Sequence, residues 1–184
     1  MLKTSKIAVA NSGGADSTCL LFLLNEYIKK LSPNKAHRLL SLTIDHDLQP
    51  TSAQMAEHAA KFAESLRVEH VTTKIPWGEG IYPPKPTSTD QLELLARDSR
   101  YALFFAAMRD ARVSTLALAH HADDQAETML MRLGKGTTTL GMIGMLPRSR
   151  WGMGSESEGL NWRGHLGMKM YRIRPFLGVG KVIF

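Results

Sequence analysis

The sequence has 184 residues, of which 43% are hydrophobic, so it is long enough for one domain with a sizeable buried core. No run approaches the roughly 20 apolar residues that a membrane span requires, so no membrane partner is expected. The single cysteine, Cys19, excludes a disulfide framework and a Cys-x-x-Cys site, and its apolar neighbours predict a buried place in a helix.

Short apolar runs alternate with segments of helical periodicity along the chain. We expect strands at 7–10, 39–44 and 115–119, with a weaker one at 70–75. Helices are expected between them and after the last one. The first has an apolar face that consists of Leu20, Leu23, Leu24, Tyr27 and Leu31; the others cover 51–66, about 90–111 and about 123–134.

Two local signals refine this outline. Thr51, with Gln54 three residues later, has the spacing of a capping box at the start of the second helix. The segment 76–89 contains four prolines and two glycines, so we expect a loop there, and a mobile one.

Strands that alternate with helices predict right-handed crossovers and therefore an α/β fold. We expect a doubly wound, Rossmann-like parallel sheet in three layers, α/β/α. Ligands bind such sheets beyond the carboxyl ends of the strands, near the switch in strand order. Polar segments follow three of the expected strands, at 11–17, 45–47 and 120–124. If these strands are neighbours, the three segments converge on one site.

The first of these segments is a glycine-rich turn with the sequence Ser12-Gly13-Gly14-Ala15-Asp16-Ser17. Its glycines let backbone N–H groups approach a phosphate, and the following helix N-terminus adds partial positive charge. The Gly-Lys-Ser/Thr ending of a Walker A loop is missing, and Asp16 is present instead. A carboxylate beside a triphosphate predicts a bridging Mg²⁺ ion. The alternative is an ordinary glycine turn in which Asp16 or Ser17 caps the helix.

A carboxylate pair follows the last expected strand. Asp124 and Glu127 are three residues apart on a helix, so both face the same side and together could bind an ammonium group. Two other interpretations stay open. Asp123 or Asp124 could cap the helix while Glu127 is solvated, or histidines and aspartates could bind a metal.

The formal charge of +6 is concentrated near the end of the sequence. Residues 1–130 contain 14 Lys/Arg and 15 Asp/Glu, whereas residues 131–184 contain 9 and 2. Such an excess suits a polyanion, because Lys and Arg that neutralise phosphates release condensed counterions. Arg148 and Arg150 are candidates for RNA contact on this basis. The alternative is a basic surface that is only solvated.

Several motifs resemble known families. The Ser-Gly-Gly-x-Asp-Ser segment (12–17) resembles the PP-loop of the N-type ATP pyrophosphatases, whose fold is of the adenine nucleotide alpha hydrolase type. The segment His-His-x-Asp-Asp-Gln-x-Glu-Thr (120–128) resembles the signature of the tRNA(Ile)-lysidine synthetases. Ile-Asp-His (44–46), Ala-Arg-x-x-Arg-Tyr (96–101) and Arg174-Pro175 with Lys181 also resemble that family, although Asp47 stands where a glycine is usual.

The resemblance implies that residues 1–184 form a single PP-loop ATP-binding catalytic domain, with a basic, glycine-containing C-terminal part at 134–184. Further tRNA-binding domains usually follow in this family, and the chain is expected to be a catalytic domain without them. A homodimer is an open possibility. The cytoplasm is the default location, with a mitochondrion or plastid as the alternative.

The implied reaction is an AMP-forming ligation of L-lysine to C2 of the wobble cytidine of an isoleucine tRNA with a CAU anticodon. ATP and Mg²⁺ are the implied cofactors. The residues implied to bind ATP are Ser12, Gly13, Gly14, Ala15, Asp16, Ser17, His46 and Arg97. Asp16 also positions Mg²⁺, Asp124 and Glu127 bind lysine, and Asp16, Asp124, Glu127 and Arg100 form the implied catalytic set.

Other interpretations of these motifs remain. A tRNA thiolation enzyme would activate the same kind of base oxygen, but it needs cysteines to carry sulfur or a cluster. A small-molecule synthetase and a catalytically inactive nucleotide- or RNA-binding domain are further alternatives. Without the family resemblance, Arg97 and Arg100 could equally lie on a solvated helix face, whereas Tyr101 is expected in the core.

Overall fold

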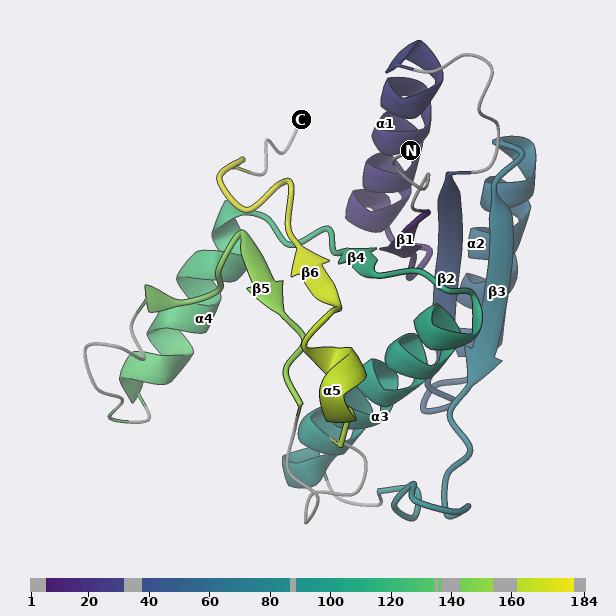
Figure 1. Cartoon of the computed structure of the whole chain (residues 1–184). Coiled ribbons are helices and arrows are strands. Elements are labelled where there is room, and N and C mark those ends of the chain that lie inside the picture. The colour runs from purple at the N-terminus through teal and green to yellow at the C-terminus, as the bar shows by residue number, and fades with distance from the viewer. Residues whose placement is uncertain are drawn as a thin grey trace.

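The computed structural model describes residues 6–31, 38–86, 89–134, 136, 143–153 and 162–180 (Figure 1). Lys181 therefore lies outside the described residues. The strands are β1 (Ile7–Ala10), β2 (Leu39–Asp45), β3 (Glu69–Lys74), β4 (Thr115–Ala117), β5 (Arg148–Arg150) and β6 (Tyr171–Ile173). The helices are α1 (Ala15–Leu31), α2 (Ser52–Ser65), α3 (Thr89–Asp110), α4 (Ala122–Gly134) and α5 (Gly164–Gly167).

The strands form one sheet in the order β3-β2-β1-β4-β6-β5. Neighbouring strands from β3 to β6 are parallel, and only the edge strand β5 pairs in the antiparallel direction. The chain moves from β1 outward to β3 and then returns to the other side of β1 as β4, so the strand order switches between β1 and β4. This confirms the predicted doubly wound fold, except that β5, β6 and α5 were not expected from the sequence.

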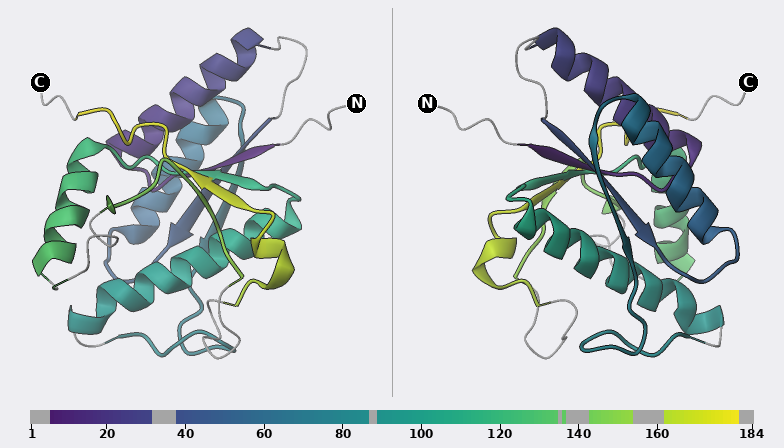
Figure 2. Two further views of the ribbon diagram at one scale, coloured as in Figure 1. Left: turned by 60° about the vertical axis from the view of Figure 1, so that its left-hand side comes forward. Right: turned by 90° about the vertical axis from the view of Figure 1, so that its right-hand side faces the viewer.

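Helices cover both faces of the sheet (Figure 2). Ala8 and Val9, adjacent in β1, are both fully buried because their side chains point to opposite faces. Val9 packs in a cluster that includes Leu20 of α1, and Ala8 packs in one that includes Phe104 of α3. The three-layer arrangement is thus confirmed. No helix of the described residues is both long and apolar enough to cross a membrane.

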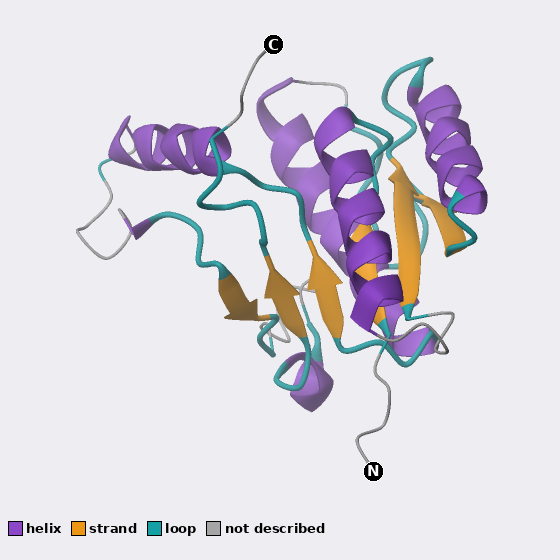
Figure 3. Cartoon of the chain, turned by 90° about the horizontal axis from the view of Figure 1, so that it is seen from above, coloured by secondary structure: helices purple, strands orange, loops and turns teal. Residues whose placement is uncertain are grey.

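Helix α4 differs from the other long helices. It extends away from the sheet in Figures 1 and 3, and none of its residues, all of which the structure describes, is buried. Large apolar side chains are consequently exposed along it, namely Met129, Leu130, Met131 and Leu133.

The buried face of α1 differs from the predicted one. Leu20 is buried as expected, but Leu23, Tyr27 and Leu31 are 47%, 60% and 62% exposed. The buried residues are instead Ser17, Leu20, Leu21 and Asn25. The apolar pattern was misleading because two polar residues face inward, where each finds a hydrogen-bond partner. Cys19 lies on the solvent side, so its predicted burial is wrong.

The predicted capping box at Thr51 is also wrong. Helix α2 begins at Ser52, one residue after Thr51, but Thr51 has helical backbone angles (φ −83°, ψ −8°) and its side chain caps nothing. The Ser52 hydroxyl instead donates to the Gln49 carbonyl at 2.8 Å. A capping residue needs an extended backbone so that its side chain can reach the first free N–H groups of the helix. The Thr51 backbone is already helical, so its hydroxyl is not placed to accept from them.

The proline-rich segment is a loop, as predicted, and its described part is attached to the end of β2. The Trp77 indole N–H donates to the His46 carbonyl at 2.9 Å. The Lys85 and Lys74 ammonium groups lie 3.3 and 3.0 Å from the Asp47 carboxylate. Asp47 has φ +52°, in the left-handed region where glycine is favoured and aspartate is tolerated. This explains why a glycine is usual here in the family that the motifs resemble.

Candidate functional site

The glycine-rich turn between β1 and α1 is held by its own hydrogen bonds. Asn11, which is 1% exposed, accepts from the Gly13 N–H at 3.1 Å and from the Ser17 hydroxyl at 3.3 Å. The Ser17 oxygen in turn lies 3.2 Å from the Ser12 N–H and 3.0 Å from the Gly14 carbonyl. Ser17 therefore organises the turn from its buried side, and Asn11 fixes Ser17.

Gly13 cannot be replaced without moving the backbone. Its φ of +80° lies in the left-handed region, and a Cβ atom would come within 2.7 Å of the Met55 carbonyl oxygen in α2. Gly14 has no such restriction, because the nearest atom to its added Cβ would be the Ser12 Oγ at 3.5 Å. The turn is thus locked against α2 at Gly13.

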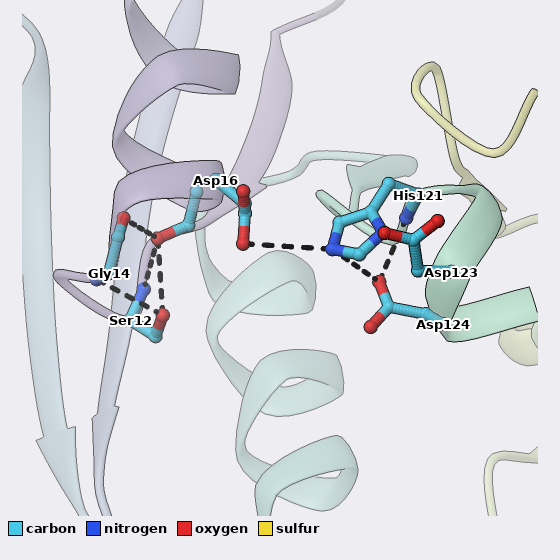
Figure 4. Close-up of polar contacts among 7 residues, drawn as sticks. Ser12, Gly14, Asp16, His121, Asp123 and Asp124 are labelled. Atoms are coloured by element: carbon cyan, nitrogen blue, oxygen red, sulfur yellow. Dashed lines mark hydrogen bonds and ion pairs between the residues drawn. The ribbon is translucent and has the colours of Figure 1, made fainter. Parts of the chain in front are cut away.

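The start of α4 faces this turn (Figure 4). The Asp124 carboxylate accepts a 2.8 Å hydrogen bond from the backbone N–H of His121, which satisfies a free donor at the helix N-terminus. The His121 ring lies between two carboxylates, with its Nε2 3.5 Å from Asp124 Oδ2 and 3.9 Å from Asp16 Oδ2. The capping interpretation of Asp124 therefore holds, and the same residue faces the glycine-rich turn across His121.

A metal site built from histidine and aspartate side chains alone is not supported here. Within the part of the chain that the structure describes, no group of three or more His, Cys, Asp or Glu side chains is arranged to hold a metal ion. The charged groups around His121 are spaced as ion pairs at 3.5 to 4.0 Å instead.

A cavity of about 200 Å³ opens at the carboxyl ends of β1 and β4, where the strand order switches. It brings together most of the predicted site residues. Its polar lining consists of Asn11, Ser12, Gly14, Asp16, Ser17, His46, Arg100, Tyr101, His120 and Asp124.

A second hollow of about 370 Å³ continues from the first and contains the remaining charged candidates. Arg97 of α3 and Glu127 of α4 line it, and Arg100 and Asp124 line both hollows. Asp124 and Glu127 thus share one wall, as their spacing predicted. Gly13 and Ala15 do not line either hollow, because Gly13 packs against α2 and Ala15 is exposed.

Arg174, after β6, is a site residue that sequence reasoning missed. It is 8% exposed, and its Nε donates to His120 Nδ1 at 3.2 Å while its Nη1 donates to the Leu146 carbonyl at 2.8 Å. Burial, assisted by the Arg174 charge, lowers the pKa of His120 to about 4. His120 is therefore neutral at pH 7, with its proton on Nε2. The Arg174-Pro175 pair was the available signal, but nothing in the sequence placed it beside His120.

Burial and nearby arginines favour neutral imidazoles in this cavity. Burial lowers the pKa of His46, and the nearby Arg100 guanidinium lowers it further. Burial also lowers the pKa of Arg100, whose guanidinium nevertheless remains a cation at neutral pH. Tyr101, expected in the core, packs edge-on against Phe104 at 6.5 Å and lines both hollows as well.

Comparison with known proteins finds similarity to curated tRNA(Ile)-lysidine synthases. The tRNA(Ile)-lysidine synthase of Ruegeria pomeroyi is 39% identical over 147 residues, which cover 78% of this chain and 31% of that protein. The synthase of Hyphomonas neptunium is 32% identical over 177 residues, covering 96% and 44%. The resemblance inferred from the motifs is thus confirmed, although the chain spans less than half the length of either relative.

A solved structure shares the fold. The U34-tRNA thiolase NcsA from Methanococcus maripaludis, solved with its [4Fe-4S] cluster, superposes with a TM-score of 0.67 at 20% identity, over 97% of this chain and 54% of that one. The family model for the PP-loop domain matches residues 2–182. With this match and the glycine-rich turn at the switch point, the chain belongs to the PP-loop domain family.

Proposed function

We propose that this chain is the catalytic domain of an ATP-dependent ligase that joins lysine to C2 of the wobble cytidine of an isoleucine tRNA. One observation carries the proposal. The PP-loop and the Asp124 carboxylate line the same cavity, and Glu127 lines the hollow that continues from it. A site for a nucleotide and a site for an ammonium group are therefore adjacent, as a ligation of an amine through an adenylated intermediate requires.

The nucleotide end is built from the turn between β1 and α1. Ser12, Gly14 and Ser17 line the cavity beside the N-terminus of α1, whose partial positive charge favours phosphate. His46 and Arg97 complete the proposed ATP contacts. His46 suits a nucleotide because burial and Arg100 keep its ring neutral and thus available as both donor and acceptor.

Asp16 fits the proposed Mg²⁺ ion. Its side chain is 42% exposed and lines the cavity next to the turn, and carboxylate oxygens are ligands that Mg²⁺ prefers. A bound Mg²⁺ would neutralise charge on the departing phosphates. The His121 Nε2 lies 3.9 Å from the Asp16 carboxylate and 3.5 Å from that of Asp124, so Asp16 faces the start of α4.

The proposed chemistry has two steps. The C2 oxygen of cytidine attacks the α-phosphorus of ATP, and the bond to the β-phosphate breaks so that pyrophosphate leaves with the electron pair. The lysine ε-amine then attacks C2, the C2–oxygen bond breaks, AMP leaves, and the amine loses its proton to solvent. Arg100 would pair with the α-phosphate in the first step, because a guanidinium matches phosphate oxygens two at a time.

The other end of the site would select lysine. Asp124 and Glu127 would bind its α-ammonium group, which leaves the ε-amine free to react. Both carboxylates line the same hollow, so they can bind one ammonium group from two sides.

A thiolation activity is the strongest alternative, because NcsA shares the fold. That thiolase carries a [4Fe-4S] cluster, and such clusters are held by several cysteine thiolates. This sequence contains one cysteine, Cys19, which is exposed on α1. The composition therefore favours an amine over sulfur as the second reactant.

Incubation of the chain with ATP, Mg²⁺, ¹⁴C-lysine and an unmodified isoleucine tRNA transcript tests the proposal. We expect label in RNA, dependent on ATP and abolished when the wobble cytidine is replaced by uridine. Label in no RNA, together with AMP release in the presence of another amine or of a sulfur donor, would indicate a different PP-loop enzyme. Absence of any pyrophosphate release would indicate a domain that only binds.

A further inference from the structure

A third hollow, of about 340 Å³, lies where α3 meets the β5–β6 edge of the sheet and is not used by the proposed chemistry. We call it the arginine hollow. It is lined by Leu94, Arg97, Asp98, Tyr101, Trp151, Arg163 and Arg172. Three guanidinium groups face one carboxylate, so the hollow has an excess of positive charge that suits an anion.

Arg172 of β6 is held rigidly in this hollow. Its guanidinium carbon lies 5.6 Å from the centroid of the Tyr101 ring and 5.5 Å from that of the Trp151 ring. Its Nη2 donates to the Arg150 carbonyl at 3.0 Å, whereas its Nε is buried without a hydrogen-bond partner among the described residues. Burial also lowers the pKa of Arg172, so an anion that accepted from Nε would offset a desolvation cost.

Arg163 is fixed on the other side. The residue is 8% exposed, its guanidinium carbon lies 5.2 Å from the Phe105 ring centroid, and its Nη1 donates to the Trp162 carbonyl at 3.1 Å. Arginines that are stacked on rings before a ligand arrives lose little side-chain entropy on binding. The aromatic rings in this hollow therefore position cations, and the cations are the groups that would meet a ligand.

The arginine hollow adjoins the candidate active site. Arg97 and Tyr101 line both it and the hollow that contains Glu127. The phosphates of ATP already have the PP-loop, whose residues line the first cavity and not the arginine hollow. An anion in the arginine hollow is therefore a different part of the reactants, and the only other polyanion in the proposed reaction is the RNA.

We propose that the arginine hollow binds a backbone phosphate of the RNA strand that presents the target nucleotide. This inference rests on the proposed function, and it assigns a role to Arg163 and Arg172. An RNA phosphate held here would place the strand along α3, with the adjacent nucleotide directed toward the cavity that Arg100 and His120 line.

The β5–β6 pair supplies a matched control. Arg148 and Arg150 pair with Ile173 and Tyr171, so they lie on the face of the sheet opposite Arg172. Their guanidinium carbons lie 4.3 and 5.7 Å from the Tyr171 ring centroid, outside the arginine hollow. Neutralising Arg148 and Arg150 therefore removes the same charge as neutralising Arg163 and Arg172, but outside the hollow.

The test compares binding of the isolated anticodon stem-loop RNA by the parent, the Arg163→Gln/Arg172→Gln variant and the Arg148→Gln/Arg150→Gln control, over a salt series. We expect the hollow variant to bind at least about tenfold more weakly, with a salt slope shallower by about one unit, and the control to change by less than about threefold. ATP affinity, measured in parallel, should be unchanged in both, which shows that the folded site persists.

A substitution that is expected to strengthen RNA binding guards the test against misfolding, because a misfolded variant would not bind more tightly. Asp98→Asn removes the only carboxylate that lines the hollow among the described residues, and we expect it to tighten RNA binding. Equal loss in the hollow variant and the control, or no loss in the hollow variant, would overturn the proposal. Weakened binding of inorganic phosphate or pyrophosphate alone, with RNA affinity intact, would show a site for a free anion and would equally overturn it.

The RNA-binding test and the lysine-incorporation test can fail independently of each other. Loss of RNA binding in the hollow variant supports the arginine hollow even if no lysine is incorporated. Lysine incorporation that proceeds normally in the hollow variant supports the function and contradicts the arginine hollow.

Discussion

The two ends of the site are constructed in different ways. At the β1–α1 end, the backbone turn is fixed by buried hydrogen bonds through Asn11 and Ser17 and by the contact of Gly13 with α2. At the α4 end, Asp124 and Glu127 belong to a helix that has no buried residue, and they share a hollow with Arg97 and Arg100 of α3. The first end is part of the core, whereas the second is placed at its surface.

Because of this difference, substitutions at the two ends should differ in how much they affect stability and ligand affinity. Substitutions at the positions that fix the turn at the first end, such as Gly13, change its shape and so affect stability and chemistry together. Substitutions at the second end remove charge from a surface that little else depends on, so we expect them to affect ligand affinity more than stability. The predictions below test this distinction, from the largest expected effect to the smallest.

Gly13→Ala should have the largest effect. The added methyl would clash with the Met55 carbonyl and the backbone would be strained at φ +80°, so we expect a loss of about 2 kcal/mol in the free energy of unfolding and no detectable pyrophosphate release. Urea denaturation and a pyrophosphate assay measure both. Gly14→Ala is the matched control for stability and should change the free energy of unfolding by less than about 0.5 kcal/mol. Equal destabilisation of the two variants would contradict the locked turn.

Asp16→Ala should remove chemistry without unfolding the chain. Its side chain is 42% exposed and contributes little packing, so the midpoint of urea denaturation should stay close to that of the parent. Loss of a charge that positions the metal and phosphates should reduce turnover by roughly a thousandfold. Turnover measured at saturating Mg²⁺ decides this, and a variant with normal turnover would refute the proposed role of Asp16.

Glu127→Gln and Asp124→Asn should raise the KM for lysine by about 30-fold each, which corresponds to about 2 kcal/mol for a charge-assisted contact. They should differ in stability. Asp124 also accepts from the His121 N–H, so Asp124→Asn should cost roughly 1 kcal/mol of folding free energy, while Glu127→Gln should cost almost none. A lysine KM that is normal in both variants would leave only the capping role.

Acidification should give the smallest effect. His120 has a folded pKa of about 4 and an unfolded value near 6.5, so the unfolded chain binds more protons between these values. The stability that the neutral ring provides is complete above pH 6.5 and is lost as the pH falls toward 4. Asp124 raises the pKa of His120, whereas Arg174, Arg100 and Arg97 lower it.

His120→Asn tests this assignment, because its amide oxygen can still accept from Arg174 Nε. The free energy of unfolding should fall less steeply from pH 8 to pH 4 in the variant, by on the order of 1 kcal/mol, because the partial exposure of the His120 ring reduces the effect of its full pKa shift. The pKa values of His46 and His70 are also lowered, so stability falls on acidification for these residues too. This contribution is the same in the parent and in the His120→Asn variant. Identical slopes would show that His120 does not titrate as its surroundings indicate.

The sequence predicted the first end better than the second. β1 is a continuous apolar run and α2 has an apolar face at helical spacing, and a parallel sheet brings the segments after β1, β2 and β4 to one edge. The convergence of Asp16, His46 and Asp124 on one cavity followed from that rule. The burial of Asn11 did not, because its partners Ser41 and Ala59 lie far away in sequence.

The β5–β6 edge shows why the second end was harder to predict. β5 has the sequence Arg-Ser-Arg and β6 has Tyr-Arg-Ile, so neither three-residue strand has an apolar run. Their arginines were expected as one basic surface. Strand alternation instead separates Arg172 from Arg148 and Arg150 onto opposite faces, and this depends on pairing that no local pattern encodes.

The most direct test of the account is transfer of label from [α-³²P]ATP to RNA. If the first end activates the tRNA and the second supplies lysine, Glu127→Gln should accumulate ³²P-labelled, adenylated tRNA at low lysine, and Asp16→Ala should form none. Parent protein should lose this label to AMP when lysine is added. Label that appears on lysine rather than on RNA, or RNA that remains unlabelled in Glu127→Gln, would contradict the proposed order of activation and capture.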